Sequence, residues 1–149
     1  MKYLEFLRTM PDVVLPHIPE HLSGIKPHQP FRWIIQFNFG EQRLHYEVGR
    51  VAHSKDLELG FHFESKDKTL NRYLLTGFRR HLFEIRDSLG DQIQAEVWDR
   101  GWAKVYERVP EAPITADYQI EVGRRLAEII SCLQPIFIDL REDVRQIHR

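Results

Sequence analysis

The sequence predicts an α+β fold in two layers, with an antiparallel sheet of about five strands and helices on one face of it. Apolar and polar residues alternate with a period of two in several segments between residues 31 and 107. Segments with the three-to-four-residue apolar spacing of helices flank and interrupt these strands. The expected order is therefore helix, three strands, helix, two strands, helix, all within one domain that spans residues 1–149.

Residues 1–30 are expected to form an N-terminal helix and a proline-rich arm that packs against the domain. Residues 2–9 have the spacing of a short amphipathic helix. Five prolines then follow between residues 11 and 30, and proline interrupts helices and sheet ladders because it lacks a backbone N–H. Apolar residues such as Val14 and Ile18 indicate that the arm is packed rather than free.

Residues 31–39, 42–51 and 57–63 are predicted to form three neighbouring strands. Gly40-Glu41 fits a two-residue hairpin loop, which would place Leu44 opposite Phe37. The same alternation puts Trp33 on the apolar face of the sheet. The opposite, polar face would carry His45, Glu47, Glu58, His62 and Glu64.

Residues 68–89 are expected to form one long helix, with Asp67 as its N-cap and Gly90 directly after its end. Its apolar stripe is wider than one contact with a sheet requires. A second contact, such as a dimer interface, is therefore predicted for Tyr73, Leu75 and Phe83.

The last predicted helix runs from about Asp117 to near Arg141, and Pro135 is expected to bend it. Cys132, the single cysteine of the chain, falls among its apolar residues. One cysteine forms no internal disulfide, which is typical of a protein of the reducing cytoplasm. We therefore expect a soluble, cytoplasmic protein.

Two tryptophans, Trp98 and Trp102, bracket a turn between two further strands within residues 92–107. Asp99 and Arg100 suit the centre of a type I turn, and Gly101 supplies the left-handed residue that closes it. Large aromatic side chains on the polar face of a sheet indicate a binding surface or an interface. The cross-strand pairs expected beside them are Glu96 with Lys104 and Gln94 with Tyr106.

The favoured function is a non-enzymatic interaction or binding module, and the protein is expected to be a homodimer with a possible protein or peptide partner. Aromatic side chains dominate the energetics of interfaces, and Arg100 at the hairpin tip could contact an anion or be an ordinary solvated turn residue. The formal net charge of −1 gives no indication of nucleic-acid or membrane binding. The expected binding or interface residues are His45, His62, Trp98, Arg100, Trp102 and Tyr106.

No cofactor and no metal ligand are assigned from the sequence. The stretch from His17 to His21 matches the H-x-x-E-H string of inverted zinc proteases, but Pro19 would leave His17 outside a helix that carries His21. Histidines and carboxylates on the polar face could perform acid–base chemistry or bind a metal. The same residue types also line ordinary solvated sheet faces.

An alternative function is a metal-dependent nuclease-like enzyme. Glu64-Ser65-Lys66 resembles the E-x-K motif of restriction-type nucleases, in which acidic groups hold a metal and the lysine orients water. The resemblance implies that Glu47 is the second carboxylate. Ser65 departs from the motif, since an apolar residue is usual in the middle.

Two further resemblances concern larger parts of the chain. The order of elements resembles that of type III secretion chaperones, which implies a small dimer that holds a client segment. A second resemblance, to a family of uncharacterised prokaryotic proteins, rests on Gly60-Phe61-His62-Phe63-Glu64, Asn71, Leu89-Gly90 and Trp98-Asp99-Arg100-Gly101-Trp102. More distantly, residues 57–137 resemble a domain that follows the nuclease domain in restriction-related proteins. These families imply a prokaryotic accessory role and no catalytic residue.

Overall fold

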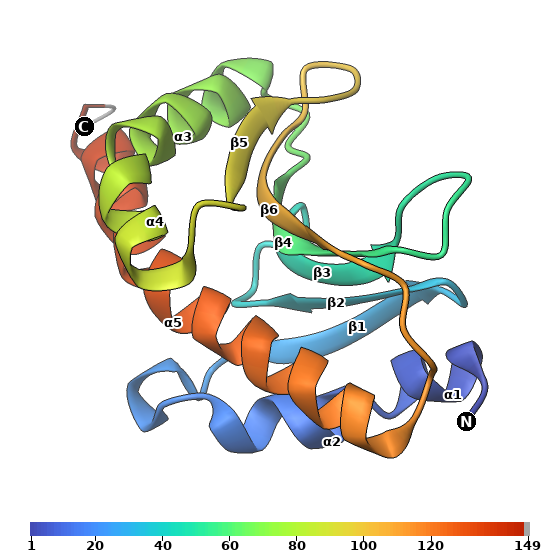
Figure 1. Ribbon diagram of the computed structural model, residues 1–149. Helices are drawn as coiled ribbons and strands as arrows, with labels where there is room; N and C mark the ends of the chain where they lie inside the picture. Colours follow the sequence, from blue (N-terminus) through green and yellow to red (C-terminus); the bar gives the residue numbers. More distant parts are fainter. Residues whose placement is uncertain (148–149) are drawn as a thin grey trace.

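Figure 1 shows the computed structural model of the chain, which describes the backbone of residues 1–147 and the side chains through Val144. The protein has an open antiparallel sheet with the strand order β1-β2-β3-β4-β6-β5. The predicted α+β fold is confirmed, and the sheet has six strands rather than five. The strands are β1 (Lys26–Phe31), β2 (Ile34–Asn38), β3 (Leu44–Arg50), β4 (Leu57–Phe63), β5 (Gln94–Val97) and β6 (Ala103–Val109).

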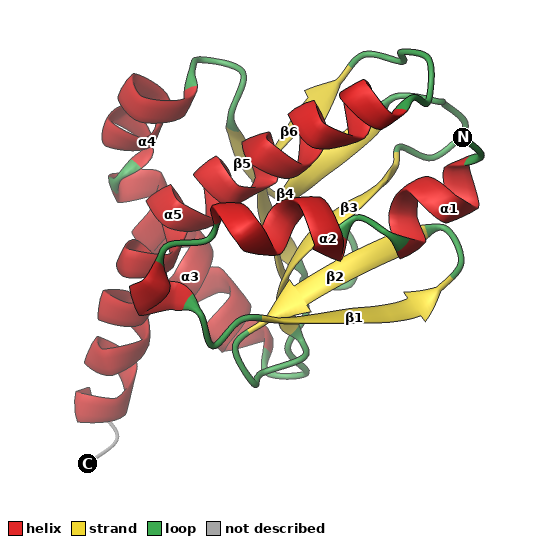
Figure 2. Ribbon diagram, turned by 90° about the horizontal axis from the view of Figure 1, so that it is seen from below, coloured by secondary structure: helices red, strands yellow, loops and turns green. Residues whose placement is uncertain are grey.

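Helices lie against the apolar face of the sheet, and Figure 2 shows α1, α2 and α5 on the same side of it. Two single turns of 3-10 helix follow α2 in the arm. The helices are α1 (Tyr3–Arg8), α2 (Pro11–Val14), η1 (Leu15–His17), η2 (Glu20–Leu22), α3 (Lys68–Arg80), α4 (Leu82–Leu89) and α5 (Ala116–Ile147). Among residues 1–147, no helix combines the length and the apolar character needed to cross a membrane.

The extra strand comes from the end of the proline-rich arm. The predicted strand 31–39 is wrong at its start, because the chain turns at Arg32 and Trp33 and pairs Phe31 with Ile34. Trp33 therefore lies at a hairpin tip with 60% of its surface exposed, instead of in the core. It stacks on Phe31 with ring centroids 5.1 Å apart.

The pairing of β2 with β3 differs from the prediction by two residues. Phe37 pairs with Tyr46 rather than with Leu44. The connection runs over residues 39–43, where Gly40 has a φ of +117° and its N–H donates to Asn38 Oδ1. Because side chains alternate with a period of two, a slip of two residues keeps every side chain on its predicted face.

The expected helix over residues 68–89 is divided at His81 into α3 and α4. Asp67 caps α3, accepting from the backbone N–H groups of residues 69 and 70, as predicted. Leu75 is buried in the core of its own chain, so it is not available to a second subunit. Phe83 is 88% exposed, and is the one residue of the predicted second contact that lies free on the surface.

Helix α5 packs across the sheet and carries much of the core. It contains Pro135, and Figures 1 and 2 both show a change of direction along the helix, as the sequence predicts. The hydroxyl of Tyr46 donates to Gln134 Oε1 over 2.9 Å within this core. The largest fully buried side chains include Phe6, Phe37, Tyr46, Phe61, Phe63 and Phe78.

Gly60 permits a close approach of β4 and β6 on the polar face. A Cβ atom at this position would lie 2.4 Å from Tyr106 Cβ and 2.5 Å from the carbonyl oxygen of Val105. We expect Gly60→Ala to lower the free energy of unfolding by about 3 kcal/mol, since backbone cannot yield as a flexible side chain does. Urea denaturation measures this loss.

Gly24→Ala is the matched control, because no atom lies within 4 Å of the added Cβ. We expect this variant to stay within about 0.5 kcal/mol of the wild type. Equal denaturation midpoints for the two variants would contradict the close approach.

Candidate metal centre on the polar sheet face

Two neighbouring strands bring histidines and carboxylates together on the polar face of the sheet. His45 and Glu47 lie on β3, His62 lies on β4, and Glu64 directly follows β4. His45 pairs with His62 across the two strands, and their rings stack with centroids 5.6 Å apart. We call these four residues, His45, Glu47, His62 and Glu64, the His–Glu cluster.

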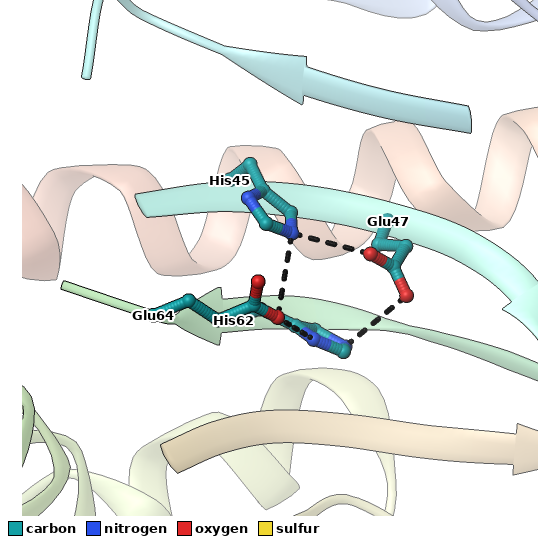
Figure 3. Close-up of side chains that lie close together, drawn as sticks. All are labelled: His45, Glu47, His62 and Glu64. Carbon is teal, nitrogen blue, oxygen red and sulfur yellow. Dashed lines mark hydrogen bonds and ion pairs between the residues drawn. The ribbon is translucent and has the colours of Figure 1, made fainter. Parts of the chain in front are cut away.

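The four side chains form a closed ring of polar contacts, which Figure 3 shows. His45 Nε2 lies 3.2 Å from Glu47 Oε1 and 3.7 Å from Glu64 Oε2. His62 Nδ1 lies 3.0 Å from Glu64 Oε2, and His62 Nε2 lies 3.9 Å from Glu47 Oε2. One ligand atom from each residue lies within 4.8 Å of all the others, so one cation could contact all four.

Polar groups outside the His–Glu cluster form further contacts with its side chains. His45 Nδ1 lies 2.8 Å from the backbone carbonyl oxygen of Gln42. Gln36 Nε2 donates to Glu47 Oε1 over 3.2 Å. On the other side, His62 Nε2 lies 2.8 Å from Glu58 Oε2.

The two histidines are almost completely buried. Their side chains are 2% and 3% exposed, whereas those of Glu47 and Glu64 are 14% and 17% exposed. Solvent therefore reaches the cluster from the carboxylate side.

Burial and charge act in opposite directions on His62 and Glu47. Burial alone would lower the pKa of His62, but Glu47, Glu58 and Glu64 outweigh it and raise the pKa to about 10. Burial would likewise raise the pKa of Glu47, but His62, His45 and Gln36 lower it to about 2. In the metal-free protein His62 is therefore protonated and Glu47 is ionised, and the attraction between these opposite charges stabilises the cluster.

The surroundings of His45 define where its hydrogen lies. A carbonyl oxygen only accepts hydrogen bonds, so the contact with Gln42 requires the hydrogen on Nδ1. Nε2 lies beside carboxylate oxygens of Glu47 and Glu64, which are acceptors as well. A positive charge between them, either a proton or a metal ion, makes this buried arrangement favourable.

The tryptophan hairpin lies beside the cluster on the same face. The predicted pairs of β5 and β6, including Glu96 with Lys104, are confirmed. The Trp98 ring meets His62 edge-to-face with centroids 5.7 Å apart, and Lys104 Nζ lies 5.1 Å from the Trp98 ring centroid. Trp98 is 40% exposed, so it covers the cluster only in part.

The prediction of a type I turn in this hairpin is wrong, because Arg100 has a positive φ. Arg100 and Gly101 have φ values of 54° and 79°, and the N–H of Trp102 donates to the carbonyl of Asp99 over 2.7 Å. Two successive residues with positive φ match the twist of antiparallel strands better than a type I turn does. The Arg100 guanidinium lies 5.9 Å from the Trp102 ring centroid, at the tip and away from the His–Glu cluster.

The remaining sequence-derived candidates are only partly brought to the site. Tyr106 lies on the same face, where its hydroxyl donates to Glu96 and Lys104 Nζ lies 4.3 Å from its ring centroid. Lys66 is exposed and forms no ion pair with Glu47 or Glu64 in the described part of the chain. His17 and His21 lie in separate 3-10 turns, so the H-x-x-E-H string does not form one helical face.

Asn71 joins the segment that directly follows Glu64 to the tryptophan hairpin, a role that the sequence pattern does not predict. Its side-chain amide is fully buried, accepts from the N–H of Ser65 and donates to the carbonyls of Ser65 and Gly101. An asparagine in the first turn of a helix that follows a strand is the signal that could have revealed this bridge.

Asn71→Ala is expected to lower the free energy of unfolding by about 1–3 kcal/mol, because it removes the partner of part-buried backbone groups of Ser65 and Gly101. Asn71→Asp keeps the acceptor for the Ser65 N–H but sets a buried carboxylate oxygen against two carbonyl oxygens, so we expect a loss at least as large. Thermal or urea denaturation measures both, and an unchanged stability of the alanine variant would show that the bridge contributes nothing.

No protein-family model matches the chain, and neither a curated protein nor a solved structure matches it. The resemblances to prokaryotic families therefore stay predictions. The functional assignment rests on the chemistry of the sheet face itself.

Proposed function

We propose that this protein binds a divalent transition-metal ion in the His–Glu cluster. The observation that carries the proposal is the buried Nε2 atom of His45, which faces two carboxylates while Nδ1 is bound to the Gln42 carbonyl. A hydrogen on Nε2, or a metal ion in its place, satisfies these acceptors, and an imidazole nitrogen that has lost its hydrogen is a common metal ligand.

The donor set favours a particular class of ion. Two imidazole nitrogens and two carboxylate oxygens suit Zn²⁺ and its first-row neighbours, whereas Mg²⁺ and Ca²⁺ prefer oxygen ligands alone. The partial exposure of Glu47 and Glu64 supports entry of the ion from solvent on that side.

The metal would occupy the same aromatic and polar face that the sequence predicts to be a binding surface. Trp98 and Lys104 border the cluster, so a partner on this face would lie next to the ion. In this proposal the protein is a binding module, and the metal orders the face on which a partner is recognised.

Calorimetric titration of the metal-free protein with Zn²⁺ tests the proposal. We expect one Zn²⁺ per chain, and much weaker binding of Mg²⁺ under the same conditions. Failure to bind Zn²⁺, or equal affinities for Zn²⁺ and Mg²⁺, would contradict it.

Tryptophan fluorescence gives a second readout at the site. Ni²⁺ quenches nearby indoles, and Trp98 contacts His62 whereas Trp33 lies at the tip of another hairpin. We expect quenching that is strongly reduced in Trp98→Phe and retained in Trp33→Phe. Equal quenching in both variants would place the ion elsewhere.

A second candidate is a metal-dependent nuclease-like activity, which is favoured by the proximity of Glu47 and Glu64 in one cluster. Cleavage of DNA that requires Mn²⁺ and disappears in Lys66→Ala would support it. A Mn²⁺-loaded protein without any cleavage would exclude it.

The homodimer also stays a proposal, and light scattering of the purified protein tests it. The exposed aromatic residues available for such a contact are Phe31, Trp33, Phe83 and Trp98.

A further inference from the structure

Glu58 lies next to the His–Glu cluster but outside the ring of four side chains. It is on β4, four residues before His62 and on the same face of the sheet. Its Oε2 atom lies 2.8 Å from His62 Nε2, which is the shortest contact that either histidine makes with a carboxylate.

The other oxygen of Glu58 is already engaged. Lys104 Nζ donates to Glu58 Oε1 over 2.5 Å, and both side chains are only 14% exposed. A carboxylate that is neutralised by a buried lysine is a weaker competitor for a metal ion than one without such a partner. Glu58 is therefore fitted to hold an N–H group.

The two nitrogens of His62 thus have different neighbours. Nε2 faces Glu58, which Lys104 fixes, whereas Nδ1 faces Glu64 Oε2 at 3.0 Å. The same Glu64 oxygen lies 3.7 Å from His45 Nε2. His62 Nδ1 and His45 Nε2 therefore converge on one carboxylate oxygen, and the opposite nitrogen of each ring is held by an acceptor.

We infer that Glu58 is a positioning residue, which directs His62 to bind the metal through Nδ1 by accepting a hydrogen bond from Nε2–H. Gln42 does the same for His45 through its backbone carbonyl, so His45 binds through Nε2. Orientation of a metal-bound histidine by a carboxylate also makes the ring nitrogen a stronger ligand. This inference rests on the proposed metal binding and adds which atom binds and what orients it.

Nitrogen-15 NMR of the histidine side chains in the Zn²⁺-bound wild type tests the assignment directly. We expect the shift of a metal-bound nitrogen at His62 Nδ1 and at His45 Nε2, with hydrogens kept on His62 Nε2 and His45 Nδ1. Coordination of His62 through Nε2 would overturn the inference, because Glu58 would then have no hydrogen to accept.

Glu58→Gln gives an independent measurement by Zn²⁺ titration. Loss of an outer carboxylate partner reduces metal affinity by about 10–100-fold, and we expect a reduction in this range with the stoichiometry unchanged. Glu96→Gln is the matched control, because Glu96 lies on the same face but contacts Tyr106 rather than the cluster. Equal Zn²⁺ affinities for the two variants would overturn the role of Glu58.

The two proposals fail in different ways. A wild-type protein that binds no Zn²⁺ overturns the metal site as a whole. A wild type that binds Zn²⁺ with His62 coordinated through Nε2, or with an affinity that Glu58→Gln does not change, overturns only the inference about Glu58.

Discussion

His45→Asn is expected to reduce the affinity for Zn²⁺ by more than 100-fold. The asparagine amide nitrogen takes the place of His45 Nδ1 and keeps the donor for the Gln42 carbonyl, while the Nε2 ligand is lost. Removal of a ligand should reduce the affinity by more than the roughly 10–100-fold that follows removal of an outer partner.

His62→Gln is the corresponding change on β4, and we expect a similar loss of Zn²⁺ affinity. The amide nitrogen of the glutamine replaces His62 Nε2 beside Glu58, while the Nδ1 ligand is lost.

His81→Asn is the matched control for both changes. His81 lies between α3 and α4, its side chain is 41% exposed, and its Nδ1 lies 3.4 Å from Glu84 Oε2, outside the His–Glu cluster. We expect the wild-type Zn²⁺ affinity in this variant. If all three variants bind Zn²⁺ alike, the ion does not lie in the His–Glu cluster.

The metal-free protein is expected to lose stability as the pH rises from 6.5 to about 10. His62 has a usual pKa of 6.5, and its surroundings raise the pKa to about 10 in the folded protein. The folded state therefore binds more protons than the unfolded state in this interval. Stability therefore falls as the pH rises through this interval, and the stabilisation is fully present below pH 6.5.

Below about pH 4.5, stability is expected to depend on pH in the opposite direction. The pKa of Glu47 falls from 4.5 to about 2 on folding, so its contribution is present above pH 4.5 and is lost as the pH falls toward 2. Stability from these two residues should be greatest between about pH 4.5 and 6.5. Urea denaturation at a series of pH values, with a chelator present, measures the profile.

His62→Gln separates this effect from other titrations. The variant should be less stable at pH 6 and should lose little further stability between pH 6.5 and 9, because the titrating group is gone. A wild type whose stability is constant over that interval, or a variant with the same slope, would show that His62 does not hold its proton in the folded protein.

The alternation of apolar and polar residues was sufficient to predict the faces of β3, β4 and β6. It placed His45, Glu47, His62 and Glu64 on one face, and it gave the register of β5 with β6 because the short turn fixes that pairing. The slip between β2 and β3 left these faces unchanged because it is even.

Other features depend on contacts that a local pattern does not contain. The turn at Arg32 and Trp33 lies within an apolar alternation that only Ile34 interrupts, and no glycine or proline marks the break at His81. The burial of the two histidines follows from the pairing of β3 with β4 and from the neighbouring Trp98. The sequence predicted a polar face without indicating that both histidine rings would be nearly free of solvent, as they are in the structure.

The central claim is that the His–Glu cluster holds a metal ion. Anomalous diffraction from crystals grown with Zn²⁺, recorded on both sides of the zinc absorption edge, tests it most directly. We predict one strong anomalous peak among His45 Nε2, His62 Nδ1 and the carboxylates of Glu47 and Glu64. A zinc peak at any other position, with the cluster unchanged, would contradict the claim.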